Sequence, residues 1–206
     1  MSGKSNKSNR INIKGAVYCL VTADEKSGTT YGEVKDMGAV MQVQVTPGVS
    51  KGTLYGNGVK TENMSRLNGI TVVTDLNKIY AEVRSELMGN TMENGVVVEA
   101  AGDEPPYIAM GYEVEQTGGK SEYIWLLKGQ AQPINSNVQQ STDNIQFSTD
   151  SMTIEFIPRE SDGALRYYGD AANPDFTDAQ AKAWFRQGPS SWPVPTAPAS
   201  GEGQGV

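Results

Sequence analysis

Three carboxylates near the middle of the sequence are the side chains with the best spacing for chemistry. Glu113, Glu115 and Glu122 flank a turn at Gly118-Gly119. Two carboxyl groups about 5 Å apart are the arrangement of a retaining glycosidase. That chemistry needs a pocket that raises the pKa of one member, and residues on an open strand provide none. The pattern favours an ordinary solvated acidic face, or a surface whose function uses negative charge.

Other catalytic signatures fail on residue type or spacing. Gly118-Gly119-Lys120-Ser121 looks like the end of a phosphate-binding loop, but that motif needs a glycine at 114, where the chain has Val114. The chain has no histidine, so it lacks the usual base of serine or cysteine triads and the commonest zinc ligand. Cys19 lies in an apolar run and is predicted to be a small buried hydrophobe. We therefore expect no enzyme, no metal and no cofactor.

Composition limits the class of protein. The chain has 206 residues, one cysteine and a formal charge of −7. One cysteine cannot form an intramolecular disulfide, and residues 1–10 contain no apolar run like that of a signal peptide, so we expect synthesis and assembly in a cytoplasm. No stretch approaches the roughly 20 apolar residues of a membrane span. The negative charge disfavours tight binding to nucleic acid or anionic lipid.

The elements that must position these residues are mostly strands. Alternation of apolar and polar residues over 38–46 predicts a half-buried strand with Val43 and Val45 on one side. Further strands are predicted at 11–22, 69–74, 95–100, 144–149 and 151–158. Residues 47–62 are rich in glycine and predict a long loop or a ragged hairpin. The body is expected to be mainly β.

One helix is predicted beside these strands. Ile79, Val83 and Leu87 follow the helical repeat, with Asp75 as the expected cap at its start and Gly89 as the residue that ends it.

Residues 105–133 predict a long hairpin. A two-residue turn at Gly118-Gly119 sets the expected pairing, which we list as Val114 with Tyr123, Tyr112 with Trp125, Met110 with Leu127, and Glu115 with Glu122. The first three pairs give an apolar face. Its aromatic side chains suit the core of a sandwich better than a sugar-binding platform.

The chain divides into three parts. Residues 1–10 are a polar, basic N-terminal arm, 11–160 are the β domain, and 161–206 are a C-terminal extension. A short capped helix with Trp184 and Phe185 is predicted near 177–186, and the last nineteen residues contain four prolines and four glycines. On its own, this tail should be disordered.

Several pieces of the sequence, in this order, resemble a known family. They are INIKGAVYCLVT, TYGEVKDMGAV, LYGNGVKTE, DLNKIYAEVRSELMG, ENGVVVE, PPYIAMGYEVE, YIWLLKGQAQ and DNIQFSTDSMTIEFIP. Together they span residues 11–159 and resemble the major tail tube proteins of long-tailed, siphovirus-type bacteriophages. The order of strand, glycine-rich loop, helix ending in Leu-Met-Gly, and Gly-Tyr-Glu hairpin carries the resemblance.

The resemblance implies a mainly β fold, a tail-tube β-sandwich close to a barrel with one flanking α-helix, a long stacking loop and terminal arms. Six copies would form a ring, and rings would stack into a helical tube in the virion, assembled in the host cytoplasm. Its partners would be the tape measure protein inside the tube, and the terminator and distal tail or baseplate proteins at its ends. Double-stranded DNA would pass without specific binding, and no membrane would be involved. The loop at 47–62 would contact the next ring, and its candidate residues are Pro47, Lys51, Leu54, Tyr55 and Lys60.

A tube that conducts DNA favours an acidic or neutral lining, because a basic one would hold the phosphates by counterion release. The candidate lumen-facing residues are Glu99, Glu113, Glu115 and Glu122. The extension departs from the family pattern, since it is too short for an appended immunoglobulin-like domain. Its candidate anchors onto a neighbouring copy are Tyr167, Tyr168, Trp184 and Phe185.

Two other functions stay open. The first is a tail terminator, completion or baseplate-hub protein that forms one ring with the same fold. The second is a carbohydrate-binding β-sandwich.

Overall fold

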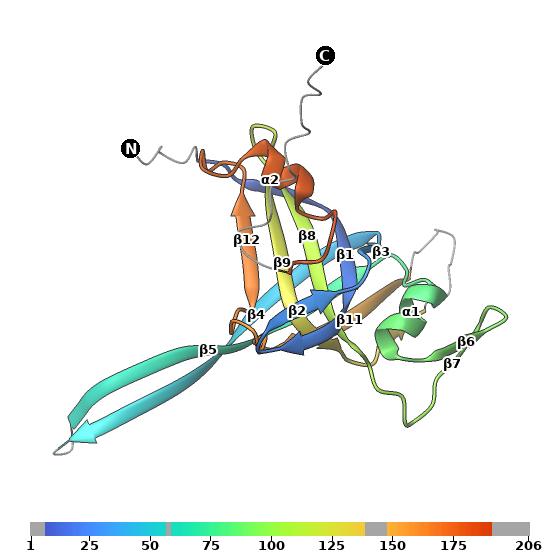
Figure 1. Ribbon diagram of the computed structural model, residues 1–206, viewed down its shortest axis with the longest axis horizontal. Coiled ribbons are helices and arrows are strands. Elements are labelled where there is room, and N and C mark those ends of the chain that lie inside the picture. Colours follow the sequence, from blue (N-terminus) through green and yellow to red (C-terminus); the bar gives the residue numbers. More distant parts are fainter. Residues whose placement is uncertain (1–6, 57–58, 139–147, 191–206) are drawn as a thin grey trace, which may run out of the picture.

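A computed structural model describes residues 7–56, 59–138 and 148–190 (Figure 1). Within them, ten strands form one antiparallel sheet: β1 (Arg10–Glu25), β2 (Gly28–Tyr31), β3 (Lys35–Gly38), β4 (Val40–Gly56), β5 (Val59–Leu76), β8 (Tyr107–Gln116), β9 (Lys120–Ala131), β10 (Asn135–Asn137), β11 (Thr149–Phe156) and β12 (Arg166–Asp170). A separate hairpin pairs β6 (Thr91–Glu93) with β7 (Val96–Val98). The helices are α1 (Ala81–Met88) and α2 (Asp178–Ala183). The mainly β prediction is confirmed.

The sheet curls back on itself. Its strand order is β2-β1-β8-β9-β11-β5-β4. β3 pairs with β1, and after Ala39 the chain continues into β4, which pairs with β5. The two ends of the strand order are therefore joined through consecutive residues, and the sheet encloses an apolar core.

The main core lies inside this curved sheet. Its largest fully buried members are Tyr18, Met37, Leu76, Leu87, Ile108, Met110, Leu126, Met152 and Phe156. Val43 and Val45 pack against it from β4, as the alternation predicts. Met41 was expected on the same side but is exposed, because a bulge between Val40 and Gln42 shifts the register there.

Helix α1 begins later than predicted. Asp75 lies in β5, where it pairs with Ser151 of β11, so it cannot cap the helix. Tyr80 is the N-cap residue and its side chain makes no capping hydrogen bond. Just before it, the Ile79 N–H donates to Asp150 Oδ2 at 2.9 Å. The predicted end is confirmed, since Gly89 takes a left-handed conformation with φ of 70°.

The β8–β9 hairpin forms with a different register. Gln116 pairs with Lys120, so Thr117 joins the two glycines in a three-residue connection. Val114 therefore faces Glu122 and Gly111 faces Trp125, which corrects the predicted partners. Both glycines have positive φ. Because side chains alternate along a strand, one extra turn residue moves Trp125 away from the main core and onto the opposite face.

Residues 47–56 and 59–62 belong to a paired hairpin. β4 and β5 pair from Val40 and Leu76 in the body to Gly56 and Val59 at the far end. Bulges follow Gly48 and Leu54. We call residues 48–69 the arm. It projects away from the rest of the molecule (Figure 1).

The C-terminal extension is part of the fold. β12 pairs with residues 122–126 of β9, while β11 pairs with residues 129–131 of the same strand. α2 begins at a capping box in which Thr177 Oγ1 accepts from the Gln180 N–H, as predicted.

Parts of three expectations lie outside the described residues. They are positions 1–6 of the N-terminal arm, most of the strand predicted at 144–149, and the proline-rich tail from 191. The rest of the N-terminal arm is described: the Thr117 N–H donates to the Asn9 carbonyl, and Arg10 opens β1.

Candidate functional site

The arm exposes apolar side chains that the body does not cover. Val49, Met64 and Leu67 are 48%, 49% and 51% exposed. Val49 and Leu67 face each other across the two strands. Single exposed hydrophobic residues are ordinary, but a narrow two-stranded ribbon that carries three of them gains stability from a partner.

The predicted stacking residues lie along this arm. Pro47 at its base is exposed and pairs with Ile70, Lys51 is exposed where β4 pairs with Ser65, and Lys60 is exposed near the far end. Leu54 and Tyr55 pair through their backbones with Glu62 and Lys60, while their side chains lie outside the described residues. The arm contains Lys51, Lys60, Arg66 and Glu62, which sum to +2 in a chain of formal charge −7.

The four candidate lumen residues do not share one surface. Glu113 and Glu115 lie on one face of β8, and Lys14 Nζ sits 3.5 Å and 3.9 Å from their carboxylates. Glu99 follows β7, away from this hairpin, and pairs with Arg84 at 2.8 Å.

Glu122 is buried on the opposite face of the hairpin. Its side chain is 8% exposed and accepts hydrogen bonds from Arg10 Nε and Gln116 Nε2, each at 2.7 Å. Burial and the Glu122 carboxylate raise the pKa of the neighbouring Tyr168 hydroxyl. Glu122 thus serves as an internal acceptor, and Glu113 and Glu115 are the members of the set that present charge together.

The candidate anchors of the extension mostly pack on the chain's own sheet. Tyr167 and Trp184 are buried in a second apolar cluster with Cys19, Ala109, Trp125 and Leu127. Trp125 Nε1 donates to the Trp184 carbonyl at 2.9 Å, and Phe185 lies edge-on to Trp125 with ring centroids 5.5 Å apart. Trp184, 1% exposed, has almost no surface left for a neighbouring copy, whereas Tyr168 is 45% exposed.

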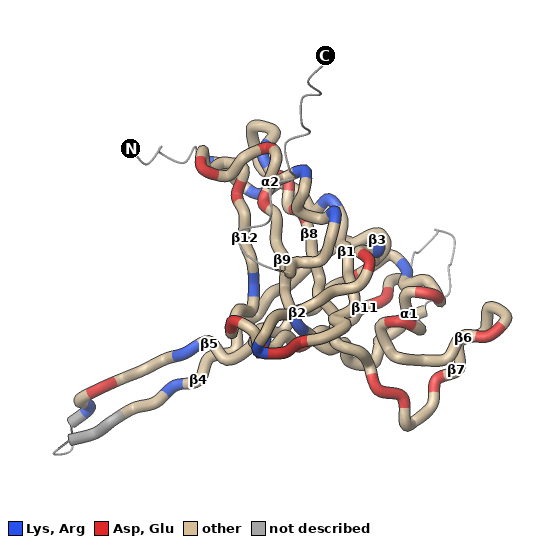
Figure 2. Tube along the Cα trace, in the orientation of Figure 1, with Lys and Arg blue, Asp and Glu red and all other residues tan. Residues whose placement is uncertain are grey.

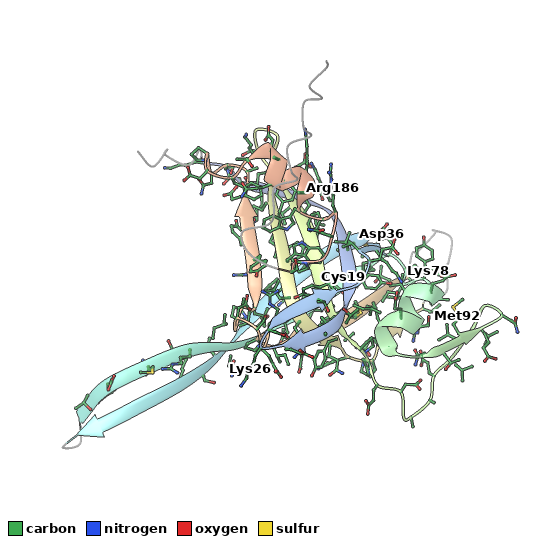
Figure 3. The ribbon with its side chains drawn as sticks, in the orientation of Figure 1. Cys19, Lys26, Asp36, Lys78, Met92 and Arg186 are labelled. Atoms are coloured by element: carbon green, nitrogen blue, oxygen red, sulfur yellow. The ribbon has the colours of Figure 1, made fainter. Side chains whose placement is uncertain are left out.

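Gly111 lies directly beneath Phe185, where the structure has no room for a side chain. A Cβ at Gly111 would lie 2.7 Å from Phe185 Cε1 and 3.0 Å from Trp125 Cε3, so only glycine allows Phe185 to approach the sheet. Cys19 is buried in the same apolar cluster (Figure 3). This burial raises the pKa of its thiol to about 12. The prediction of a small buried cysteine is confirmed.

Arg159 is an organising residue that the sequence reasoning missed. Its buried guanidinium pairs with Asp162, donates to the Tyr31 and Tyr167 hydroxyls, and donates to the Pro189 carbonyl at 2.8 Å. It therefore fixes the point at which the chain leaves the body toward residue 191. Asp162 lies three positions away, but the other partners come from β2, β12 and the stretch after α2, so local spacing could not have identified the whole set.

A groove of about 540 Å³ opens between β1, β4, β9 and β12. Its lining combines Arg10, Glu122, Arg166 and Tyr168 with apolar residues of β1 and β4. The aromatic residues of the hairpin do not form a flat exposed platform, because Tyr112 lines this groove but is only 8% exposed. Trp125 is buried under the extension, and Tyr112 is a buried member of the main core.

Within residues 7–56, 59–138 and 148–190, no three His, Cys, Asp or Glu side chains gather as metal ligands would. Neither helix among these residues has the length and apolar character needed to cross a membrane. No protein-family model matches the chain, and a search of curated proteins found no match.

Proposed function

We propose that this chain is a structural subunit that assembles with copies of itself, and specifically the major tail tube subunit of a long-tailed bacteriophage. Six copies form a ring, stacked rings form the tube, and the genome passes through its lumen during ejection. The tape measure protein fills the tube before ejection, and terminator and distal tail or baseplate proteins close its ends. The virion is the place of action, after assembly in the host cytoplasm.

The observation that carries this proposal is the arm. It is a long ribbon that leaves the body, and its described part carries half-exposed Val49, Met64 and Leu67. An element of this kind contributes little to the core of its own chain, and it has the shape of a contact to another subunit. The ordered pieces that resemble tail tube proteins supply the specific identity of the assembly.

The location of Glu113 and Glu115 supports the proposal that DNA passes through the lumen of the tube. The two side chains lie on the same face of one strand and are 26% and 37% exposed. In a ring, equivalent strands of six copies would repeat this pair around the axis. Lys14 offsets one of the two charges. Asp178, Lys182 and Arg186 line a pocket with Glu113, so the charges of these six side chains sum to zero. A neutral lining does not retain DNA phosphates.

Electron microscopy of the purified chain tests the assembly. We expect long hollow filaments at moderate salt. Single rings that do not stack would favour the terminator or baseplate-hub alternative, and a monomer at every concentration would overturn the proposal. Binding of glycans by such a monomer would support the carbohydrate-binding alternative.

A variant without the arm isolates its role. Gly48 and Gly69 face each other at the base, so residues 49–68 can be replaced by an Asn-Gly turn. We expect a folded body with an unchanged circular dichroism spectrum, and rings or monomers in place of filaments. Filaments of normal length from this variant would rule out the arm as the stacking element.

A further inference from the structure

We propose that the arm of one copy docks on the outward face of the β6–β7 hairpin of a second copy. This inference rests on the proposed self-assembly and names the surface that receives the arm. Three observations carry it: the charges of the two elements, their exposed apolar residues, and their positions in the molecule.

The arm presents a face that is apolar and basic. Val49 pairs with Leu67, and Lys51 pairs with Ser65 two residues further along, so these four side chains share one face of the ribbon. Arg66 lies on the other face, opposite Ser50, and Lys60 lies near the far end. The face contains no carboxylate among these residues, and the whole arm sums to +2.

The β6–β7 hairpin presents the complementary combination. Val96 pairs with Glu93 and Val98 pairs with Thr91, so these four side chains share one face. Val96 and Val98 are 60% and 54% exposed, whereas Met92 on the other face is partly buried and lies 3.9 Å from Ser85 Oγ of α1. The exposed valines therefore point away from the body.

The segment that carries these valines is negatively charged, and Arg84 of α1 pairs with one of its carboxylates, that of Glu99. Residues 91–104 contain Glu93, Glu99, Asp103 and Glu104 and no lysine or arginine, which sums to −4. An apolar strip edged by carboxylates fits an apolar strip that Lys51 borders on a ribbon of net positive charge. Complementary charges steer the approach and set the register while the apolar contacts exclude water.

The two elements lie at opposite ends of the molecule (Figure 2). The arm of a chain therefore cannot reach the β6–β7 hairpin of the same chain, and the contact must join two copies. Because the two surfaces are different, the contact is heterologous and leaves one arm and one hairpin free after each addition. Such a contact continues from copy to copy, as a polymer requires.

Cross-linking tests the contact directly. One chain carries Val49→Cys, a second carries Val96→Cys, and the two are mixed in equal amounts. The native Cys19 does not compete, because it is buried and burial raises the pKa of its thiol to about 12. The matched control replaces the second chain by Lys182→Cys, an exposed position on α2. We expect at least a tenfold excess of disulfide-linked dimer over the control.

The outcomes separate this inference from the proposed function. Filaments that form without excess cross-linking overturn the β6–β7 docking site and leave the tube intact. Absence of any assembly overturns both.

Charge reversal gives an independent test. One variant carries Lys51→Glu and Arg66→Glu, which changes the sum of the arm from +2 to −2, and the other carries Glu93→Lys, Glu99→Lys and Glu104→Lys, which changes the sum of residues 91–104 from −4 to +2. Each alone brings like charges together at every contact and should assemble at least tenfold less than wild type at 0.15 M salt, by sedimentation. In an equimolar mixture the arm of each variant meets an oppositely charged hairpin on the other variant, so chains that alternate have complementary charges at every contact and should recover assembly. Normal assembly of either variant alone, or failure of the mixture, would contradict the proposal.

Discussion

At the scale of single residues, Asp24 shows how distant segments are joined. Its carboxylate accepts hydrogen bonds from Lys128 Nζ at 2.7 Å, from Thr29 Oγ1 and from the Glu160 N–H. These donors belong to β9, β2 and the segment after β11. The side chains of Lys128 and Asp24 are only 11% and 5% exposed. Loss of this carboxylate would therefore loosen three parts of the sheet together.

Asp24 makes stability depend on acid pH. Burial alone would raise the pKa of Asp24, but the hydrogen bonds from Lys128, Glu160 and Thr29 outweigh it and lower the pKa below its ordinary value. A carboxyl whose pKa is lower in the folded state stabilises the protein above the unfolded pKa of about 3.9. That contribution is lost as the pH falls through the folded pKa.

We expect Asp24→Asn to lower the free energy of unfolding by about 2 kcal/mol at pH 7, the loss of hydrogen bonds to a charged group. We also expect a flatter dependence of stability on pH below 4. Urea unfolding midpoints between pH 7 and 2 measure both, with Glu33→Gln at an exposed position as the control. Identical pH profiles for Asp24→Asn and wild type would refute this role.

Prediction from sequence works at single residues where the signal is local. The burial of Cys19, the end of α1 at Gly89 and the Thr177 capping box follow from neighbours within a few positions. Arg159 and Asp24 could not be found in this way, because their partners lie up to 128 and 136 positions away. Such pairings are decided by the curvature of the whole sheet and not by local propensity.

At the scale of elements, the C-terminal extension completes the body. The part of the β8–β9 face that carries Gly111, Trp125 and Leu127 is apolar, and the extension covers it with Trp184 and Phe185. Glu113 and Glu115 follow on the same face toward the turn of the hairpin. The sequence indicated these aromatic residues but could not show that they cover their own chain. That assignment depends on the register of the β8–β9 hairpin, which Thr117 shifts by one position.

We expect Trp184→Ala to lower the free energy of unfolding by about 4 kcal/mol, since it empties a site enclosed by Tyr123, Phe176 and Trp125. Chemical denaturation followed by circular dichroism measures the loss. Tyr80→Ala removes an aromatic ring that is 56% exposed, and it should change stability by only about 0.5 kcal/mol. Equal effects of the two variants would mean that the extension is not part of the folded core.

The sequence predicted the structure of the arm only in part. Its glycines indicated a break in the body's pattern, and a ragged hairpin was one of the two expectations for residues 47–62. Continuous pairing from Gly48 to Gly56 makes it a ribbon with fixed faces, so Val49 and Leu67 meet side by side. Pairing between strands depends on cross-strand partners, which alternation along a single strand does not specify.

At the scale of the whole molecule, charge is distributed unevenly. The chain has a formal charge of −7, yet the arm sums to +2 and residues 91–104 sum to −4. An uneven distribution of this kind promotes association between unlike ends of identical copies, and salt weakens it.

The proposed tube predicts a specific effect on DNA. Glu113→Lys with Glu115→Lys turns a pair of carboxylates beside Lys14 into a basic cluster. We expect filaments to form as in wild type, but to retain double-stranded DNA at low salt and to release it as salt rises. Retention is measured by co-sedimentation, with Glu33→Lys as a control for total charge. Unchanged release from the double variant would place these residues outside the lumen.

The shared edge of β9 also sets an order of events during translation. Residues 129–131 of β9 can pair as soon as β11 has been made. Residues 122–126 pair with β12, which is synthesised later. A nascent chain that has emerged only as far as β11 therefore has an unpaired strand edge at residues 122–126 of β9. β12 is made after β11 and pairs with this remaining edge. A polypeptide that terminates before β12 therefore keeps an unpaired strand edge, which promotes aggregation.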